Sequence, residues 1–454
     1  MALAVSTLAA LLTVIDVSVV NVAFPSIRRD LGASASGLSW ILSGYSIAVG
    51  AFLLLAGRLA DQKGRRRLFM IGVAVFMVGS LLSGLATGPA WLISARVLQG
   101  IGGSILSPAS LSMVLPEFPN ERRSMVIGIW GASAALGAAI GPSIGAVVID
   151  LLSWRWVFLI NVPIGILILA ITPRFVHESR DPDATGGFDL IGVPAGTVGV
   201  ALVLLAVVQG EQWGYLSGTT LGTAAAGLLL VILLFVRSTT HPNPLLDLSL
   251  FRIRSFWSSA GGQTFFSMAF IATILFNTLL LQELWGWSVL AAGFGVVPGP
   301  ALAALLGGPV GSIADRVGHR NLLVVGSLSA ACCPAWLLWR VTMDSPYLVT
   351  VLPAQMFLGI GVACSFATFS SLGLREVPPA RFGTASASLR TGSSLGFASG
   401  VSIAIAVFSS SAASGPLVAF DRAWTFMAVV FVACALFCAV ACPGRSPVRP
   451  PSPG

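Results

Sequence analysis

Two oppositely charged residues, Asp16 and Arg96, lie deep inside long apolar stretches of the sequence. An ionisable side chain within a membrane span is costly, so it indicates a functional group whose partner should be named. With a rise of about 1.5 Å per residue through a hydrocarbon core of about 30 Å, both residues are expected roughly 9 Å below the outer surface. A carboxylate and a guanidinium at one depth can form a proton-responsive pair. The pattern is also typical of a static ion pair, or of polar groups that face a water-filled cavity.

Charged residues also gather in a short connection between two apolar stretches, where residues 57–67 read GRLADQKGRRR. Five basic residues there accompany one carboxylate, Asp61. We interpret Asp61 as a conformational latch, which binds basic loop residues or a helix N-terminus in one conformation and releases them in another. The same latch would include Gly57, Gly64 and Arg65. The alternative is a plain helix cap among arginines that determine membrane topology.

The chain repeats this connection 254 residues later, where residues 311–320 read GSIADRVGHR and place Asp315 in the frame of Asp61. Residues 95–104 (ARVLQGIGGS) likewise align with residues 354–363 (AQMFLGIGVA) at an offset of 259. A comb of glycines recurs too, Gly137, Gly141 and Gly145 matching Gly392, Gly396 and Gly400. Three matches in order indicate two halves built alike. Parallel repeats of this kind are one plan of secondary transporters, with the substrate path between the halves.

The first glycine comb suits close contact between helices. Gly137, Gly141 and Gly145 are four residues apart, so they fall on one helical face and let a second helix approach. Pro142 would weaken or bend the helix at that contact. Glycine combs mostly serve packing, and the added proline opens a second interpretation, a gating helix.

The composition excludes an ordinary soluble protein. Of 454 residues, 56% are hydrophobic and only 9% are charged, against about a quarter charged in soluble domains. The net charge of +8 could suggest nucleic acid, but a nucleic-acid binder gathers its charge on one solvated face, whereas here the charge lies in short connections. We therefore expect an all-α polytopic membrane protein in a lipid bilayer, with no nucleic-acid partner.

Fourteen stretches are long and apolar enough to span a bilayer, with approximate bounds 2–24, 38–57, 68–87, 90–115, 125–149, 157–172, 189–208, 219–236, 256–281, 289–311, 321–340, 347–371, 384–409 and 424–441. With the N-terminus inside, inner connections contain 18 basic residues and outer connections 5. Basic residues prefer the cytoplasmic side, which places both termini in the cytoplasm. The repeats predict a domain of six spans at 1–172, a linker with two inserted spans at 173–254, a second six-span domain at 255–442 and a disordered tail at 443–454.

Other polar and aromatic residues within the spans are candidates for a substrate cavity or, equally, for helix packing. They are Asn21, Gln99, Gln263, Phe266, Phe270 and Asn277. Arg390 is expected about 9 Å from the inner surface by helical rise, close enough for its side chain to reach the headgroups in a structural role. Glu283 is expected at the solvated outer end of its span.

Several signatures are absent from the sequence. It contains no GxxxxGK[ST] for ATP, and its three histidines lie in separate connections without the spacing of a metal or catalytic cluster. The sequence thus predicts neither an enzyme nor a metal site. Protons are the expected coupling ion, without a further cofactor.

At these residues the chain resembles the major facilitator superfamily, and specifically its 14-span drug:proton antiporter branch of the EmrB/QacA type. GRLADQKGRRR is similar to the loop motif of the superfamily, IDVSVVNVAFP to a first-span motif of the branch, and WRWVFLINVP to a further segment of the branch. RVLQGIGGS is similar to the fourth-span motif with its proton-linked arginine, and GAAIGPSIG to the fifth-span antiporter motif. Ala146 departs from that last motif, which ends in two glycines.

The resemblance covers essentially the whole chain and implies two six-helix bundles plus two inserted helices. It implies proton coupling by Asp16 and Arg96, and a latch at Asp61. The expected function is a proton-coupled exporter of amphiphilic organic compounds or antibiotics, acting as a monomer in a bacterial inner membrane by alternating access. An exporter or importer of one endogenous metabolite would share the fold, and a non-transporting membrane sensor is a further class.

Overall fold

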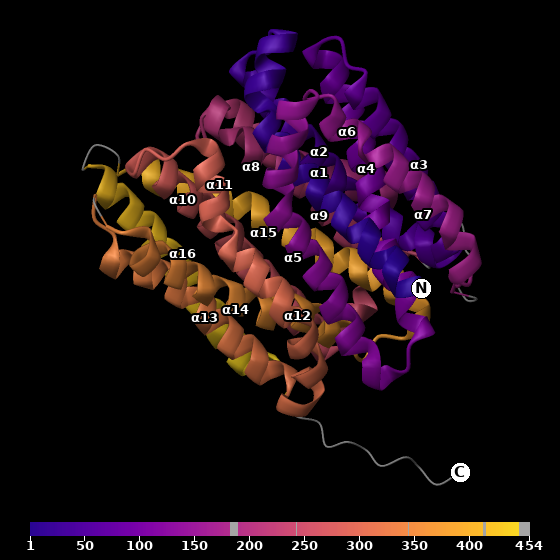
Figure 1. The fold of residues 1–454 in the computed structure, drawn as a ribbon. Helices are drawn as coiled ribbons and strands as arrows, with labels where there is room; N and C mark the ends of the chain where they lie inside the picture. The colour runs from indigo at the N-terminus through magenta and orange to yellow at the C-terminus, as the bar shows by residue number, and fades with distance from the viewer. Residues whose placement is uncertain (182–188, 242, 344, 412–414, 445–454) are drawn as a thin grey trace.

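The computed structural model describes residues 1–181, 189–241, 243–343, 345–411 and 415–444 (Figure 1). Most of the tail predicted at 443–454 therefore lies outside the described residues. For ten residues within the helices the structure describes the backbone and not the side chain: Asn21, Ala35, Ser36, Asn120, Glu121, Ala139, Pro142, Glu211, Val289 and Asp315.

The described residues form helices and no strand. In a bilayer every backbone polar group must be satisfied within the protein, and the helix does this within one segment. The first part of the chain contains α1 (Ala2–Leu31), α2 (Ala35–Lys63), α3 (Arg65–Gly84), α4 (Pro89–Val114), α5 (Asn120–Leu151), α6 (Trp156–Leu159) and α7 (Asn161–Phe175). The rest contains α8 (Gly192–Trp213), α9 (Gly218–Thr240), α10 (Arg254–Leu279), α11 (Val289–Val296), α12 (Pro298–Val317), α13 (His319–Arg340), α14 (Tyr347–Leu374), α15 (Phe382–Ser409) and α16 (Pro416–Ala441).

In the described part, 13 helices are long and apolar enough to cross a membrane, and the bent helix α5 makes a fourteenth. This matches the predicted number of spans. The two parts of α5, Arg122–Ala138 and Ser143–Leu151, meet at 44° across a break that contains Pro142. Several helices are longer than predicted: α1 continues to Leu31 and ends with Arg28 and Arg29 in its last turn, because the apolar pattern marks hydrocarbon depth and not the helix end.

The helices divide into two groups that Figure 1 separates by colour. Helices α1 to α7, indigo to magenta, pack on one another and form the N-terminal group; helices α10 to α16, orange to yellow, form the C-terminal group. Between the groups, the main contacts join α5 to α12 and α2 to α15. The inserted helices α8 and α9 pack on each other, and α8 also contacts α2 and α15.

Asp189 joins the two inserted helices at one end. Its carboxylate accepts hydrogen bonds from the Gly192 backbone N–H at the start of α8 (2.9 Å) and from Arg237 Nε near the end of α9 (3.1 Å). Burial alone would raise the pKa of Asp189, but these hydrogen bonds outweigh burial and lower it. The carboxylate thus stabilises the α8–α9 pair in its ionised form.

The internal repeat is visible as a repeated turn. Helix α2 ends before Gly64, at φ 105° and ψ 130°, and α12 ends before Gly318, at φ 95° and ψ 130°. Such a positive φ favours glycine at both positions. We call the side of the molecule that contains both turns the Asp61 end.

The glycine combs recur at equivalent helix contacts. A methyl group at Gly141 of α5 would lie 2.6 Å from Ser18 Cβ of α1, and one at Gly396 of α15 would lie 2.5 Å from the Thr264 carbonyl of α10. Both positions therefore require glycine for the observed helix separation. Each comb lies within one group of helices and not between the groups. The glycines therefore allow α5 to pack closely on α1, and α15 on α10.

Candidate functional site

Asp16 and Arg96 meet inside the N-terminal group. Arg96 NH1 of α4 lies 2.6 Å from Asp16 Oδ2 of α1, and both side chains are 0% exposed. The two residues therefore lie at the same depth, as expected from the helical rise per residue. A buried pair of this kind is stabilised only where further hydrogen bonds satisfy the remaining polar atoms.

Two amides supply those hydrogen bonds. Gln99 Nε2 donates to Asp16 Oδ1 at 2.8 Å, and Asn161 Nδ2 of α7 donates to the same oxygen at 2.9 Å. Both amides also donate to the Ser80 hydroxyl of α3, at 3.1 and 2.9 Å, which itself donates to the Phe158 carbonyl. Helices α4 and α7 therefore donate directly to the carboxylate on α1, and α3 joins the network through the Ser80 hydroxyl.

The guanidinium of Arg96 is held partly by aromatic rings. Its Cζ lies 4.3 Å from the centre of the Tyr45 ring and 5.6 Å from that of Phe158. Arg96 Nε and NH2 are buried without a hydrogen-bond partner in the described residues. The charge of Arg96 is thus balanced chiefly by Asp16, and loss of that carboxylate would leave a buried cation against aromatic faces.

A second site joins the two groups of helices. Asp61 at the end of α2 accepts hydrogen bonds from the backbone N–H groups of Gly383 (2.9 Å) and Thr384 (2.7 Å), and from the Thr384 hydroxyl (2.8 Å). These residues form the first turn of α15, whose unpaired N–H groups favour an anion. The carboxylate, 1% exposed, therefore acts as a cap provided by the opposite group.

Arg65 completes this junction. Its NH2 atom lies 2.7 Å from Asp61 Oδ1 and donates to the carbonyls of Pro379 (2.7 Å) and Ala380 (2.6 Å) of the C-terminal group. Both binding partners expected for the latch, a basic residue and a helix N-terminus, are present together. Gly57 is equally constrained, because a methyl group there would lie 2.6 Å from the Gly383 carbonyl.

Glu178, in the connection after α7, also lies at the Asp61 end of the molecule. Its two carboxylate oxygens accept hydrogen bonds from the backbone N–H groups of Arg66 and Arg67, both at 3.0 Å. Glu178 thereby caps α3, and a methyl group at Gly64 would lie 2.6 Å from its carboxyl carbon. No motif in the sequence indicates this role for Glu178. The side chain of Asp315, the repeat partner of Asp61, lies outside the described residues.

A hydroxyl pair also bridges the groups at the Asp61 end. Ser124 Oγ of α5 and Ser371 Oγ of α14 are 2.7 Å apart, and His319 Nε2 lies 3.0 Å from the same Ser371 oxygen. Nearby, a methyl group at Gly128 would lie 2.6 Å from the Gly307 carbonyl of α12. The two groups are therefore in close contact at this end.

Residues 6–401 match the Major Facilitator Superfamily. The chain belongs to this family. The match confirms the resemblance expected from the sequence motifs.

Curated relatives of this major facilitator protein include a multidrug resistance protein, Stp, of Mycobacterium tuberculosis, 34% identical over 85% of this chain and 72% of the relative. A cephamycin export protein, CmcT, of Amycolatopsis lactamdurans is 32% identical over 91% of this chain and 86% of the relative. Among solved structures, the proton:xylose symporter XylE matches with a TM-score of 0.71 at 17% identity, covering 98% of this chain and 95% of that one. The human transporter MFSD10 matches with a TM-score of 0.67 at 17% identity, covering 96% and 98%. The last two similarities concern the fold alone.

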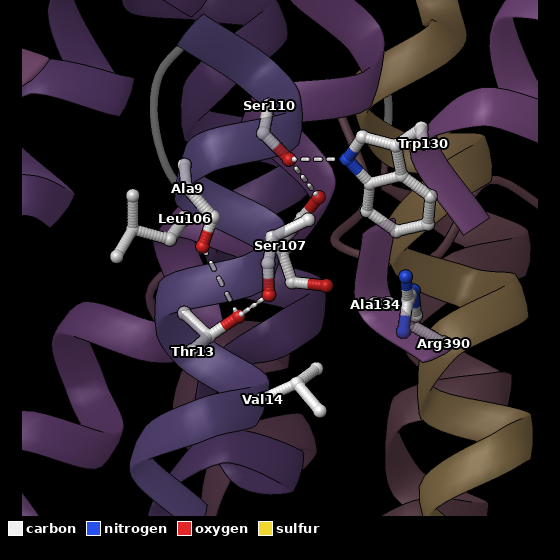
Figure 2. A pocket seen from close by; sticks show the side chains of 10 residues that line it. Ala9, Thr13, Val14, Leu106, Ser107, Ser110, Trp130, Ala134 and Arg390 are labelled. Atoms are coloured by element: carbon white, nitrogen blue, oxygen red, sulfur yellow. Dashed lines mark hydrogen bonds between the residues drawn. The ribbon is translucent and has the colours of Figure 1, made fainter. Parts of the chain in front are cut away.

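A small cavity of about 40 Å³ lies between the two groups of this major facilitator protein (Figure 2). It is lined by Ala9, Ala10, Thr13, Val14, Leu106, Ser107, Ser110, Trp130, Ala134 and Arg390. Sites for small organic ligands usually measure about 300–1,000 Å³. The cavity is therefore too small for a drug-sized molecule in this conformation.

The expected cavity residues that the structure describes do not line this small cavity. Gln99 is buried beside Asp16, Phe266 packs edge-on against Phe366 and Phe431, and Asn277 donates to Cys333 Sγ at 3.6 Å. Gln263 is buried and Phe270 contacts the same aromatic cluster. The physical reason is that α10 packs on α15, α16 and α14 of its own group. Asn21 has its side chain outside the description.

Arg390 contacts the opposite group of helices. Its Cζ lies 4.6 Å from the centre of the Trp130 ring, which belongs to α5. The contact joins α15 to α5. Glu283, as expected, is exposed.

Proposed function

We propose that this major facilitator protein is a proton-coupled exporter of amphiphilic organic compounds, antibiotics among them. The fully buried pair of Asp16 and Arg96, with its 2.6 Å contact, is the observation on which the coupling rests. Export is supported by relatives that are called multidrug resistance, puromycin resistance and cephamycin export proteins.

The orientation follows from the basic residues. Connections on the Asp61 side contain 18 of them against 5 on the other side, so the Asp61 end faces the cytoplasm and both termini lie there. The contacts of Asp61 with α15 then close the cytoplasmic side. In this orientation, the described conformation is one in which substrate cannot enter from the cytoplasm.

Proton entry from outside supplies the driving force. A proton that reaches Asp16 removes its charge, which weakens the attraction to Arg96 and changes how α1 and α4 fit together. A membrane potential of 100 mV alone supplies about 2.3 kcal/mol per charge that crosses. Because the site lies among helices of the N-terminal group, protonation acts on that group and not directly on the substrate.

The latch regulates access from the cytoplasm. To open that side, Asp61 and Arg65 must release Gly383, Thr384 and the carbonyls of Pro379 and Ala380. We infer that residues 1–172 and 255–442 rock as two units, with residues 173–254 following. The proposal requires one copy of the chain, because both groups that enclose the cavity come from it.

A drug-susceptibility panel tests this function. A host without its own efflux pumps would express the wild-type chain, the Asp16→Asn variant or no transporter. The proposal predicts resistance to several amphiphilic antibiotics with the wild type, and its loss with Asp16→Asn at equal abundance in the membrane. Unchanged susceptibility to every compound, or a gain of sensitivity that indicates import, would count against export.

A further inference from the structure

Two arginines lie within the membrane spans, and within the described part of the chain only one of them has a carboxylate partner. Arg96 pairs with Asp16 at 2.6 Å. Arg390 of α15 has no ion pair and no hydrogen bond among the described residues. Its Cζ lies over the Trp130 ring, 4.6 Å from the ring centre. The position that corresponds to Arg390 in the first glycine comb is Ala135, so the charge is not part of the repeated framework.

Arg390 faces the cavity between the two groups, as Figure 2 shows. Among the described residues that line this cavity, none is a carboxylate. The opposite wall is formed by α1 and α4 and includes hydroxyl groups of Thr13, Ser107 and Ser110. The cavity therefore combines one cation, an indole face and neutral polar groups.

A guanidinium without an anion is a costly group at this depth. The ring of Trp130 compensates for part of this cost, and the partly exposed guanidinium can still donate hydrogen bonds to a group that enters the cavity. A planar carboxylate, sulfonate or phosphate would accept two parallel hydrogen bonds from that fork. An organic anion thus fits the charge and the geometry of Arg390.

We propose that Arg390 is a substrate-binding residue that selects amphiphilic organic anions and zwitterions with an aromatic or apolar body. The inference rests on the proposed export function and adds its substrate class. Trp130 and Arg390 come from opposite groups of helices, so their contact must separate when the cavity widens. The aromatic part of the substrate then takes the place of the indole ring beside the guanidinium, and its acidic group binds the guanidinium edge.

The test compares two dyes of opposite charge, carboxyfluorescein and ethidium, in inverted membrane vesicles with an imposed proton gradient. The wild type should move carboxyfluorescein in preference to ethidium. Arg390→Ala should lower the ratio of the carboxyfluorescein rate to the ethidium rate by about tenfold or more, the loss expected for one charged hydrogen-bonded contact. Arg390→Lys should retain part of the preference, and Arg390→Glu should shift it to ethidium. A folding defect would lower both rates and leave their ratio unchanged.

Binding of carboxyfluorescein to the purified protein, followed by fluorescence anisotropy, gives a readout that does not need transport. Arg340→Ala is the matched control, because Arg340 also lies over an indole, that of Trp339 at 5.5 Å, but away from the cavity. The rate ratio and the dye affinity should be unchanged in this control.

The inference is overturned if Arg390→Ala transports both dyes with the wild-type ratio, or if the wild type moves ethidium and neither moves nor binds carboxyfluorescein. In either case export itself would stand. If the gradient drives the transport of neither dye and of no antibiotic in the panel, the proposed function is overturned, and the inference with it.

Discussion

The carboxylate of Asp61 accepts a 2.9 Å hydrogen bond from the backbone N–H of Gly383, which lies 322 residues further along the chain. This contact joins the end of α2 to the first turn of α15, and it is buried together with Arg65. Asp61 therefore caps a helix of the opposite group, and the proposed latch would act through this cap. The sequence left two interpretations of Asp61 open, a conformational latch and a helix cap. Both involve the same contact between Asp61 and the first turn of α15.

Loss of the charge at Asp61 should impair the closed conformation. Asp61→Asn can still accept a hydrogen bond, but it no longer attracts Arg65 or the N-terminus of α15, so transport should fall by about tenfold or more. Initial rates of efflux at equal abundance in the membrane measure the effect. Asp315→Asn, in the repeated turn, should be milder. Equal and normal transport by both variants would reduce Asp61 to a local cap.

Gly57 should tolerate no side chain. A methyl group would lie 2.6 Å from the Gly383 carbonyl, so Gly57→Ala should push α2 and α15 apart and slow transport. Cross-linking of cysteines placed at Ser124 and Ser371, in a background without reactive native cysteines, would report the separation. Gly222→Ala is the control, because nothing lies within 4 Å of a methyl group at that position. Equal cross-linking yields in Gly57→Ala and the wild type would contradict the packing argument.

The orientation can be tested by labelling. After replacement of the exposed Cys332, single cysteines at Ser34 and Met343 should react with an impermeant thiol reagent in intact cells, and one at Thr240 should react only after lysis. Both Met343 and Thr240 are exposed, at opposite ends of the molecule. Labelling of Thr240 in intact cells would reverse the assignment of the cytoplasmic side.

Asp189 should stabilise the inserted helices in a pH-dependent manner. The pKa of Asp189 is lowered in the folded protein, so its contribution to stability is present above the unfolded value of about 3.9 and is lost as pH falls through the folded value. Asp189→Asn should lower the thermal unfolding temperature at pH 7, and the difference from wild type should shrink at pH below about 4. The exposed Glu283, changed to Gln, serves as control. A difference that is the same at both pH values would show that the ionised carboxylate is not the cause.

The sequence predicted the elements of this fold well because apolar length and charge placement follow directly from the bilayer. It also predicted the contact of Asp16 with Arg96, since depth along a helix is set by a constant rise per residue. It did not predict the cavity: which face of α10 meets another helix depends on packing between distant segments, and Phe266 and Asn277 consequently lie in the core of one group. Asn161 was missed for the same reason, although a lone amide within an apolar stretch was a usable signal.

The role of Asp16 is the central claim, and a reconstituted transport assay tests it most directly. Asp16→Asn keeps the shape of the side chain and removes the site of protonation, while Gln99 and Asn161 can still hydrogen-bond to the new amide. Accumulation of a compound from the susceptibility panel would be driven by a pH gradient in proteoliposomes, and downhill exchange of the same compound would be measured without a gradient. The account predicts that Asp16→Asn abolishes accumulation and retains exchange, with Arg96→Ala uncoupled as well. Accumulation against the gradient by Asp16→Asn at the wild-type rate would contradict it.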